Sequence, residues 1–103
     1  MRGMQDMLRQ AQMMQKKMTT MQEELKTREV EATSGGGMVA VTVTGGMEVR
    51  SITIDKSVVE AGDVEMLQDL VLTAVNDALK KSKTMSEEEM AKITGGIKIP
   101  GMF

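Results

Sequence analysis

The chain has 103 residues, of which 41% are hydrophobic and 27% charged, and its formal net charge is -2. This length suits one domain with one modest core, and the slightly acidic balance gives no overall attraction to nucleic acid or to anionic membranes. The chain contains no Cys, His, Trp or Tyr and a single Phe. These absences exclude disulfides, Cys/His zinc sites and His-dependent catalytic triads, and they argue against aromatic platforms that stack unpaired bases.

Residues 1–28 predict one long helix. Apolar side chains recur there at alternating steps of three and four, which is a heptad seam, and its members are Met4, Met7, Ala11, Met14, Met18, Met21 and Leu25. At about 1.5 Å per residue such a helix spans on the order of 36 Å, which is too long for the rest of the chain to cover. Methionine suits irregular or exchangeable surfaces. We therefore interpret the seam as packing either between two subunits or against another part of the chain.

Residues 29–55 predict an antiparallel meander of three short strands. The middle strand is the clearest, because valines alternate with alanine and threonine and so share one buried face; they are Val39, Val41 and Val43. Glycines predict a loose turn at 35–37 and a tight hairpin with positive φ at 45–46. Neither glycine segment matches the pattern of a phosphate-binding loop.

Residues 63–83 predict a second helix, with Asp63 as its N-cap and a broad apolar face that packs on the sheet. Ser86 and Glu89 match a capping box, which predicts a separate short helix over 86–94 that ends at glycine. The acidic run 87–89 falls in the first turn of that helix, where negative charge is favourable. Residues 95–103 are expected to form a flexible tail. The predicted fold class is thus α+β, with no stretch near the roughly 20 apolar residues of a membrane span, and we expect a soluble cytoplasmic protein.

Basic side chains gather in two patches. The first forms one line on the outer face of the first helix, at intervals of seven residues, and comprises Arg2, Arg9 and Lys16, with Lys17 and Lys26 beside it. The second closes the predicted second helix and comprises Lys80, Lys81 and Lys83. Both patches can contact phosphates. Each also has a purely structural explanation, as a solvated helix face or as cations that complement a helix dipole.

Three segments in this order resemble the YbaB/EbfC family of bacterial nucleoid-associated proteins: LRQAQMMQKKMTTMQEEL, VEATSGGGMVAVTVTGG and EMLQDLVLTAVNDALKKS, followed by an IPGMF tail. The resemblance implies a tweezer-like homodimer with a sheet-based body and projecting helices. It also implies that the dimer binds double-stranded DNA and alters its conformation, contributing to nucleoid organisation and gene regulation. It implies no enzyme activity, cofactor, metal, membrane partner or small-molecule substrate. The DNA contacts it points to are Arg2, Arg9, Lys16, Lys17, Lys26, Arg28, Lys80, Lys81 and Lys83.

A protein-interaction module is the alternative function. In that case the methionine seam captures hydrophobic segments of a partner protein, and the basic line only keeps an exposed helix soluble. Retardation of duplex DNA in a gel at several salt concentrations distinguishes the two functions.

Overall fold

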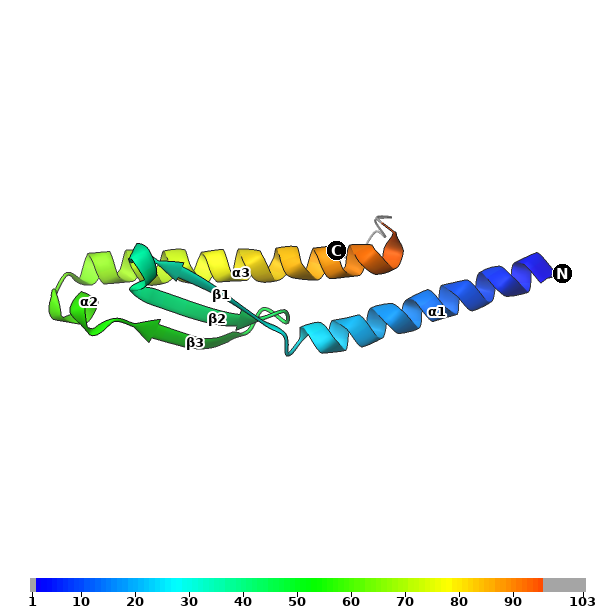
Figure 1. The fold of residues 1–103 in the computed structure, drawn as a ribbon, viewed down its shortest axis with the longest axis horizontal. Coiled ribbons are helices and arrows are strands. Elements are labelled where there is room, and N and C mark those ends of the chain that lie inside the picture. Colours follow the sequence, from blue (N-terminus) through cyan, green and yellow to red (C-terminus); the bar gives the residue numbers. More distant parts are fainter. Residues whose placement is uncertain (1, 96–103) are drawn as a thin grey trace.

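The computed structural model consists mainly of two long helices and a three-stranded sheet. It describes residues 2–95, apart from the side chain of Arg2. The elements are α1 (Arg2–Leu25), β1 (Glu29–Ser34), the 3-10 turn η1 (Gly35–Gly37), β2 (Val39–Thr44), β3 (Val49–Ile54), α2 (Lys56–Glu60) and α3 (Val64–Thr94). The molecule is strongly elongated, with extents of 72 × 20 × 19 Å. Helix α3 runs along the sheet and continues past its end, while α1 projects away from the sheet (Figure 1).

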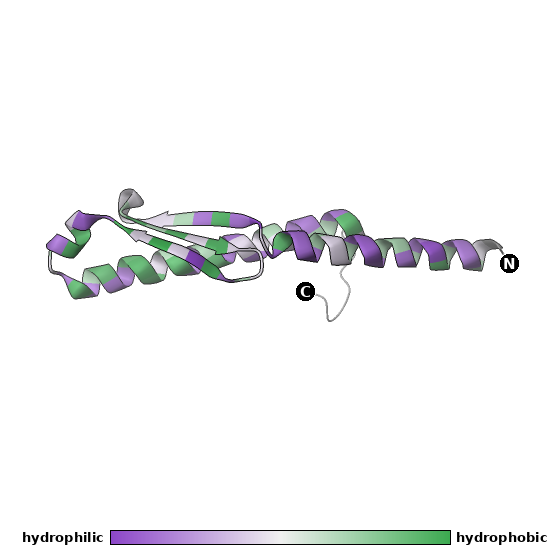
Figure 2. Ribbon diagram, turned by 90° about the horizontal axis from the view of Figure 1, so that it is seen from below, coloured by the Kyte–Doolittle hydropathy of each residue, from purple (hydrophilic) through white to green (hydrophobic). Residues whose placement is uncertain are grey.

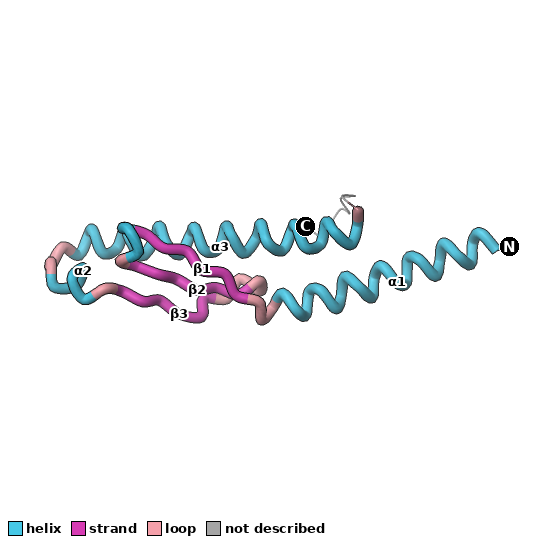
Figure 3. The backbone as a smooth tube through the Cα atoms, viewed as in Figure 1, coloured by secondary structure: helices cyan, strands magenta, loops and turns pink. Residues whose placement is uncertain are grey.

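The sheet is the antiparallel meander that the sequence predicts. Its strand order is β1-β2-β3, as the tube in Figure 3 shows, and the glycines of η1 adopt the positive φ expected of a loose turn. The valines of β2 are fully buried, which confirms their shared inner face: Val39, Val41 and Val43. Apolar segments gather where α3 lies against the sheet, whereas α1 is mainly hydrophilic (Figure 2).

Small side chains bring α3 close to the sheet. Ala74, Ala78 and Ser82 succeed one another at intervals of four residues and are fully buried, so they line one side of the helix. The Ser82 hydroxyl donates a hydrogen bond to the carbonyl oxygen of Thr44 at 2.7 Å, and the Ser34 hydroxyl donates to that of Leu70 at 2.6 Å. Helix α3 thereby covers β1 and β2 and leaves β3 largely uncovered.

The predicted break between a second helix and a short third helix is wrong. Helix α3 runs without interruption from its N-cap Asp63, as predicted, to Gly95, whose left-handed conformation ends it. Ser86 does not cap a new helix, because its hydroxyl donates to the carbonyl oxygen of Gly45 at 3.4 Å. Glu89 is engaged instead by basic side chains. The acidic run 87–89 therefore lies inside a helix and not in a first turn; residues 96–103 of the predicted tail lie outside the described residues.

Two local features differ from the sequence prediction. Helix α2 has only five residues and was not predicted. Its N-cap is Asp55, whose side chain accepts a hydrogen bond from the Ser57 amide at 2.8 Å. In the β2–β3 hairpin the positive φ belongs to Met47 and not to the glycines. Gly45 is needed for a different reason, because a Cβ atom there would overlap the backbone carbonyl of Leu25.

The methionine seam of α1 divides into two halves. Met18 and Leu25 are buried against Met90 of α3, with Met21, Met85 and Ile93 around them. Towards the N-terminus the seam leaves α3, and Met4 and Met7 are 73% and 72% exposed. The half of the seam that contains Met18 and Leu25 therefore joins α1 to α3. The half nearer the N-terminus projects. No helix within residues 2–95 is long and apolar enough to cross a membrane.

The close approach of Gly45 to Leu25 gives a stability prediction. Gly45→Ala forces the hairpin away from the end of α1, and we expect a loss of about 1–3 kcal/mol in the free energy of unfolding. Gly46→Ala is the matched control, because its Cβ atom would meet only ordinary contacts at 3.5 Å and beyond; its expected effect is within about 0.5 kcal/mol. Urea unfolding followed by circular dichroism measures both, and equal losses would contradict the packing described here.

Candidate nucleic-acid interface

Acidic and basic side chains are separated along the molecule. Residues 29–79, which form the sheet, α2 and the first half of α3, contain nine acidic and two basic side chains. Residues 2–28 contain six basic and three acidic side chains, and residues 80–95 contain four basic and three acidic ones. The body is thus strongly acidic, while α1 and the adjoining part of α3 are basic. A polyanion is repelled by the first and attracted by the second, although the whole chain is acidic.

The described basic side chains of α1 are exposed to solvent. Arg9 and Lys16 are exposed and seven residues apart, on the side of the helix opposite the buried Met18. Lys16 and Lys17 also border a groove of about 380 Å³ that includes Met21 and Ile93. The side chain of Arg2, the remaining member of the predicted line, lies outside the described residues.

Lys26 and Lys83 come together where α1, the β2–β3 hairpin and α3 meet. Both line a cavity of about 630 Å³ whose other walls include Leu25, Met47 and Met90. The sequence placed these two lysines in separate patches. Their proximity depends on the continuation of α3 past the sheet, so residue spacing alone could not reveal it.

Lys80 and Lys81 lie on a different edge of α3. They line a hollow of about 470 Å³ together with Asp77, Glu88 and two residues of β1. The Lys81 ammonium donates a hydrogen bond to the carbonyl oxygen of Glu31 at 3.1 Å. The alternative explanation of these lysines, as cations at a helix C-terminus, is wrong because α3 ends only at Thr94 and the basic residue of its last turn is Lys92.

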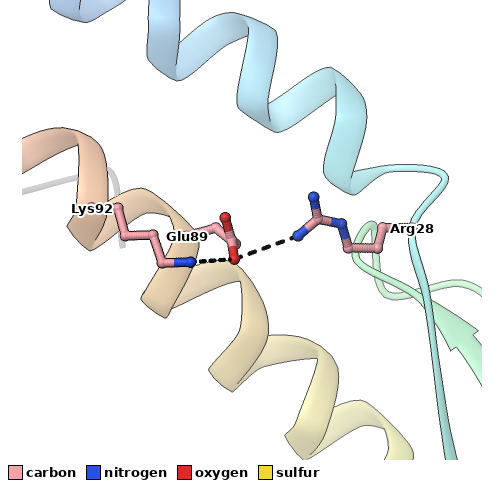
Figure 4. A network of polar contacts seen from close by, with 3 residues as sticks. All are labelled: Arg28, Glu89 and Lys92. Carbon is pink, nitrogen blue, oxygen red and sulfur yellow. Dashed lines mark hydrogen bonds and ion pairs between the residues drawn. The ribbon is translucent and has the colours of Figure 1, made fainter.

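Arg28 is held by an intramolecular partner. Its guanidinium lies 3.5 Å from the Glu89 carboxylate, which also contacts the Lys92 ammonium at 3.0 Å. Figure 4 shows Arg28 reaching this carboxylate from the segment between α1 and β1. The hydrogen bond from Lys92 lowers the pKa of Glu89, and the charges of Lys92 and Arg28 add to that effect. Arg28 therefore ties the base of α1 to α3, and part of its charge is neutralised there.

Comparison with known proteins identifies the family. Residues 1–97 match the model of the YbaB/EbfC DNA-binding family. The chain belongs to this family. It is 54% identical to a nucleoid-associated protein of Syntrophobacter fumaroxidans over 92% of this chain and 86% of the relative. It is 55% identical to one of Desulforamulus reducens, over 98% and 96% of the two chains.

A solved structure shows the same fold. The crystal structure of the uncharacterized protein HP0035 from Helicobacter pylori is similar with a TM-score of 0.71 and 29% identity, covering 82% of this chain and 89% of that one. The family match and the two relatives confirm the YbaB/EbfC resemblance that the sequence predicted. Within residues 2–95 no group of three acidic side chains is arranged to hold a metal ion, and the basic surface described above is the candidate site in this YbaB/EbfC protein.

The Glu89 ion pairs predict a pH dependence of stability. Because the folded-state pKa of Glu89 is lowered, its contribution is present at neutral pH and is lost as the pH falls through that lowered pKa. We therefore expect Glu89→Gln to be less stable than the wild type in urea at pH 7, and we expect this difference to be smaller near about pH 3, below the ordinary pKa of a glutamate carboxyl. Glu88→Gln removes a neighbouring negative charge and is the control. A stability difference for Glu89→Gln that is the same at both pH values would contradict this assignment.

Proposed function

We propose that this YbaB/EbfC protein binds double-stranded DNA through the basic surface of α1 and the adjoining part of α3. The observation that carries the proposal is the separation of charge, since the acidic body repels phosphates and leaves the projecting helix as the attractive surface. Membership of a DNA-binding family supports the same ligand. The protein is proposed to act without catalysis, cofactor or small-molecule substrate.

The chemistry of this surface favours phosphate contact over base reading. Lys and Arg neutralise phosphates and release condensed counterions, which makes affinity fall steeply with salt. The side chains proposed to do this are Arg9, Lys16, Lys17, Lys26 and Lys83, with Arg2 beyond the described side chains and with Lys80, Lys81 and Arg28 in a secondary role. Lys81 already contacts Glu31 of β1, and Arg28 already contacts Glu89 of α3. Binding is therefore expected to show modest sequence preference.

A homodimer is proposed because part of the apolar sheet face is open. Ile52 pairs with Val41 across the β2–β3 ladder, so both side chains point to the α3 side. Helix α3 leaves β3 largely uncovered, and Ile52 is 45% exposed. Leu72, 60% exposed, lies nine residues before Lys81 and therefore on the opposite side of α3, away from β1. A second copy that covers Ile52 and Leu72 completes the layer that α3 begins on this face of the sheet. The sheets of the two copies then form the body of the dimer.

Such a dimer carries two projecting basic helices related by symmetry. When both contact one duplex, their fixed separation favours DNA shapes that fit it, and the protein changes the conformation of the DNA. This is the basis for a proposed role in nucleoid organisation and gene regulation. The names of the relatives, which are nucleoid-associated proteins, support a location on the nucleoid in the cytoplasm.

Salt dependence tests the proposed DNA contacts. We expect the wild type to bind a duplex with an affinity that falls steeply between about 50 and 200 mM salt, and Arg9→Gln/Lys16→Gln/Lys17→Gln to flatten the slope by about 0.9 per lost contact. Arg50→Gln/Lys56→Gln, two neutralisations on the body, is the control with an unchanged slope. Fluorescence anisotropy measures all three. Equal slopes for the first variant and the wild type would show that α1 is only a solvated face.

Sedimentation equilibrium tests the proposed dimer surface. We expect Ile52→Glu/Leu72→Glu to sediment as a folded monomer, because it places charge in the interface, whereas the wild type has twice the mass of one chain. Thr53→Glu is the control, because Thr53 pairs with Ala40 and points to the other face of β3. A double variant that stays dimeric at micromolar concentration would move the dimer contact elsewhere.

A further inference from the structure

The distal half of α1, residues 3–15, carries an apolar face that no described part of this chain covers. Leu8 is 62% exposed, beside the similarly exposed Met4 and Met7. Figure 1 shows this half of the helix extending past the end of α3. The same seam is buried where α3 is available to it, at Met18 and Leu25. The distal half is therefore free to pack on a partner outside the chain.

We infer that the distal halves of α1 from two copies pair with each other and link molecules bound to different DNA segments. This inference rests on the proposed DNA-binding function. Within residues 3–15 only Asp6 and Arg9 are charged. The side chains that flank the seam are uncharged, namely Gly3, Leu8, Gln10 and Gln15. Like charges at such flanking positions would repel a second copy, and none are present here.

The sizes of the seam residues select an antiparallel pair. In a heptad seam an antiparallel partner sets position a against position d. Pairing centred between Met7 and Ala11 then places Met7 opposite Ala11 and Met4 opposite Met14, so that a long side chain faces a small one in two of the layers. A parallel pair would instead place Ala11 opposite Ala11, and two small side chains leave a cavity that costs stability.

The length of the distal face limits the strength of this contact. It covers about two heptads, fewer than the three or four that sustain an independent coiled coil. Pairing in free solution is therefore weak. Two copies held on neighbouring DNA segments experience a high effective concentration, which converts a weak contact into a stable link. The pairing is thus expected to depend on DNA.

The position of the basic residues gives this pairing a function. Arg9 and Lys16 lie on the side of α1 opposite the seam, and both are exposed. When two seams face each other, these side chains point outward from both helices, in opposite directions. The pair presents two basic surfaces at once, one for each duplex. The further activity inferred is the bridging of two DNA duplexes.

A two-duplex capture experiment tests the inference. Protein is added to an immobilised duplex, and the retention of a second, labelled duplex is measured. We expect Met7→Gln/Leu8→Gln to reduce captured duplex by at least about tenfold, because the avidity of the link is lost. The affinity of this variant for a single duplex is expected to stay within about twofold of the wild type, because no phosphate contact is removed. Met13→Gln is the matched control, because Met13 is 53% exposed on the same helix but off the seam.

The outcomes separate this inference from the proposed function. A wild type that fails to bind a single duplex overturns the proposed function. A wild type that binds single duplexes but captures no second one overturns the bridging inference alone. Capture that is unaffected by Met7→Gln/Leu8→Gln also overturns it, because the two duplexes would then be linked without the distal face.

Cysteine cross-linking tests the register. The chain has no native cysteine, so every disulfide reports only on an introduced site. Met7→Cys and Ala11→Cys variants that differ by a mass tag are mixed on duplex DNA and oxidised. The antiparallel register predicts that the mixed disulfide between the two variants forms predominantly. Predominant disulfides between two copies of the same variant would contradict it, as would cross-linking that is equally efficient without DNA.

Discussion

The unbroken course of α3 past the end of the sheet determines the architecture of this protein. Its buried Ala74, Ala78 and Ser82 hold the first part of the helix against β1 and β2, and the hydrogen bond from Ser82 to Thr44 fixes the point where the sheet ends. Beyond that point α3 offers Met90 to α1. If the helix broke at residues 83–86, the base of α1 would have no surface on which to pack, and the direction in which α1 projects would be undefined.

This arrangement reconciles an acidic protein with a nucleic-acid ligand. The sheet, α2 and the first half of α3 hold nine of the fifteen acidic side chains, and α1 carries its cations away from them. Where α1 meets α3, Lys26 and Lys83 line one cavity, while Arg28 is tied to Glu89. The junction therefore combines cations that are open to a ligand with one that stabilises the fold.

The sequence was sufficient wherever one segment determined its own structure. Alternating valines predicted β2, Asp63 predicted the start of α3, and glycine predicted where it stops, although that stop was assigned to a separate short helix. It failed where a local motif served a distant contact. Ser86 and Glu89 resemble a capping box, but Gly45 and Arg28 engage them. The same long-range packing brought Lys26 beside Lys83 and made the dipole explanation of Lys80 and Lys81 wrong. The five residues of α2 were too few to show a helical period.

The claim that DNA contacts α1 and its junction with α3, and not the body, is tested most directly by lysine footprinting. Lysines are acetylated with and without duplex DNA, and the modification of each is quantified by mass spectrometry. We expect duplex DNA to protect Lys16, Lys17, Lys26 and Lys83. Lys56, an exposed residue of α2 at the far end of the molecule, should stay as reactive as before. Protection of Lys56 without protection of Lys16 and Lys17 would contradict it.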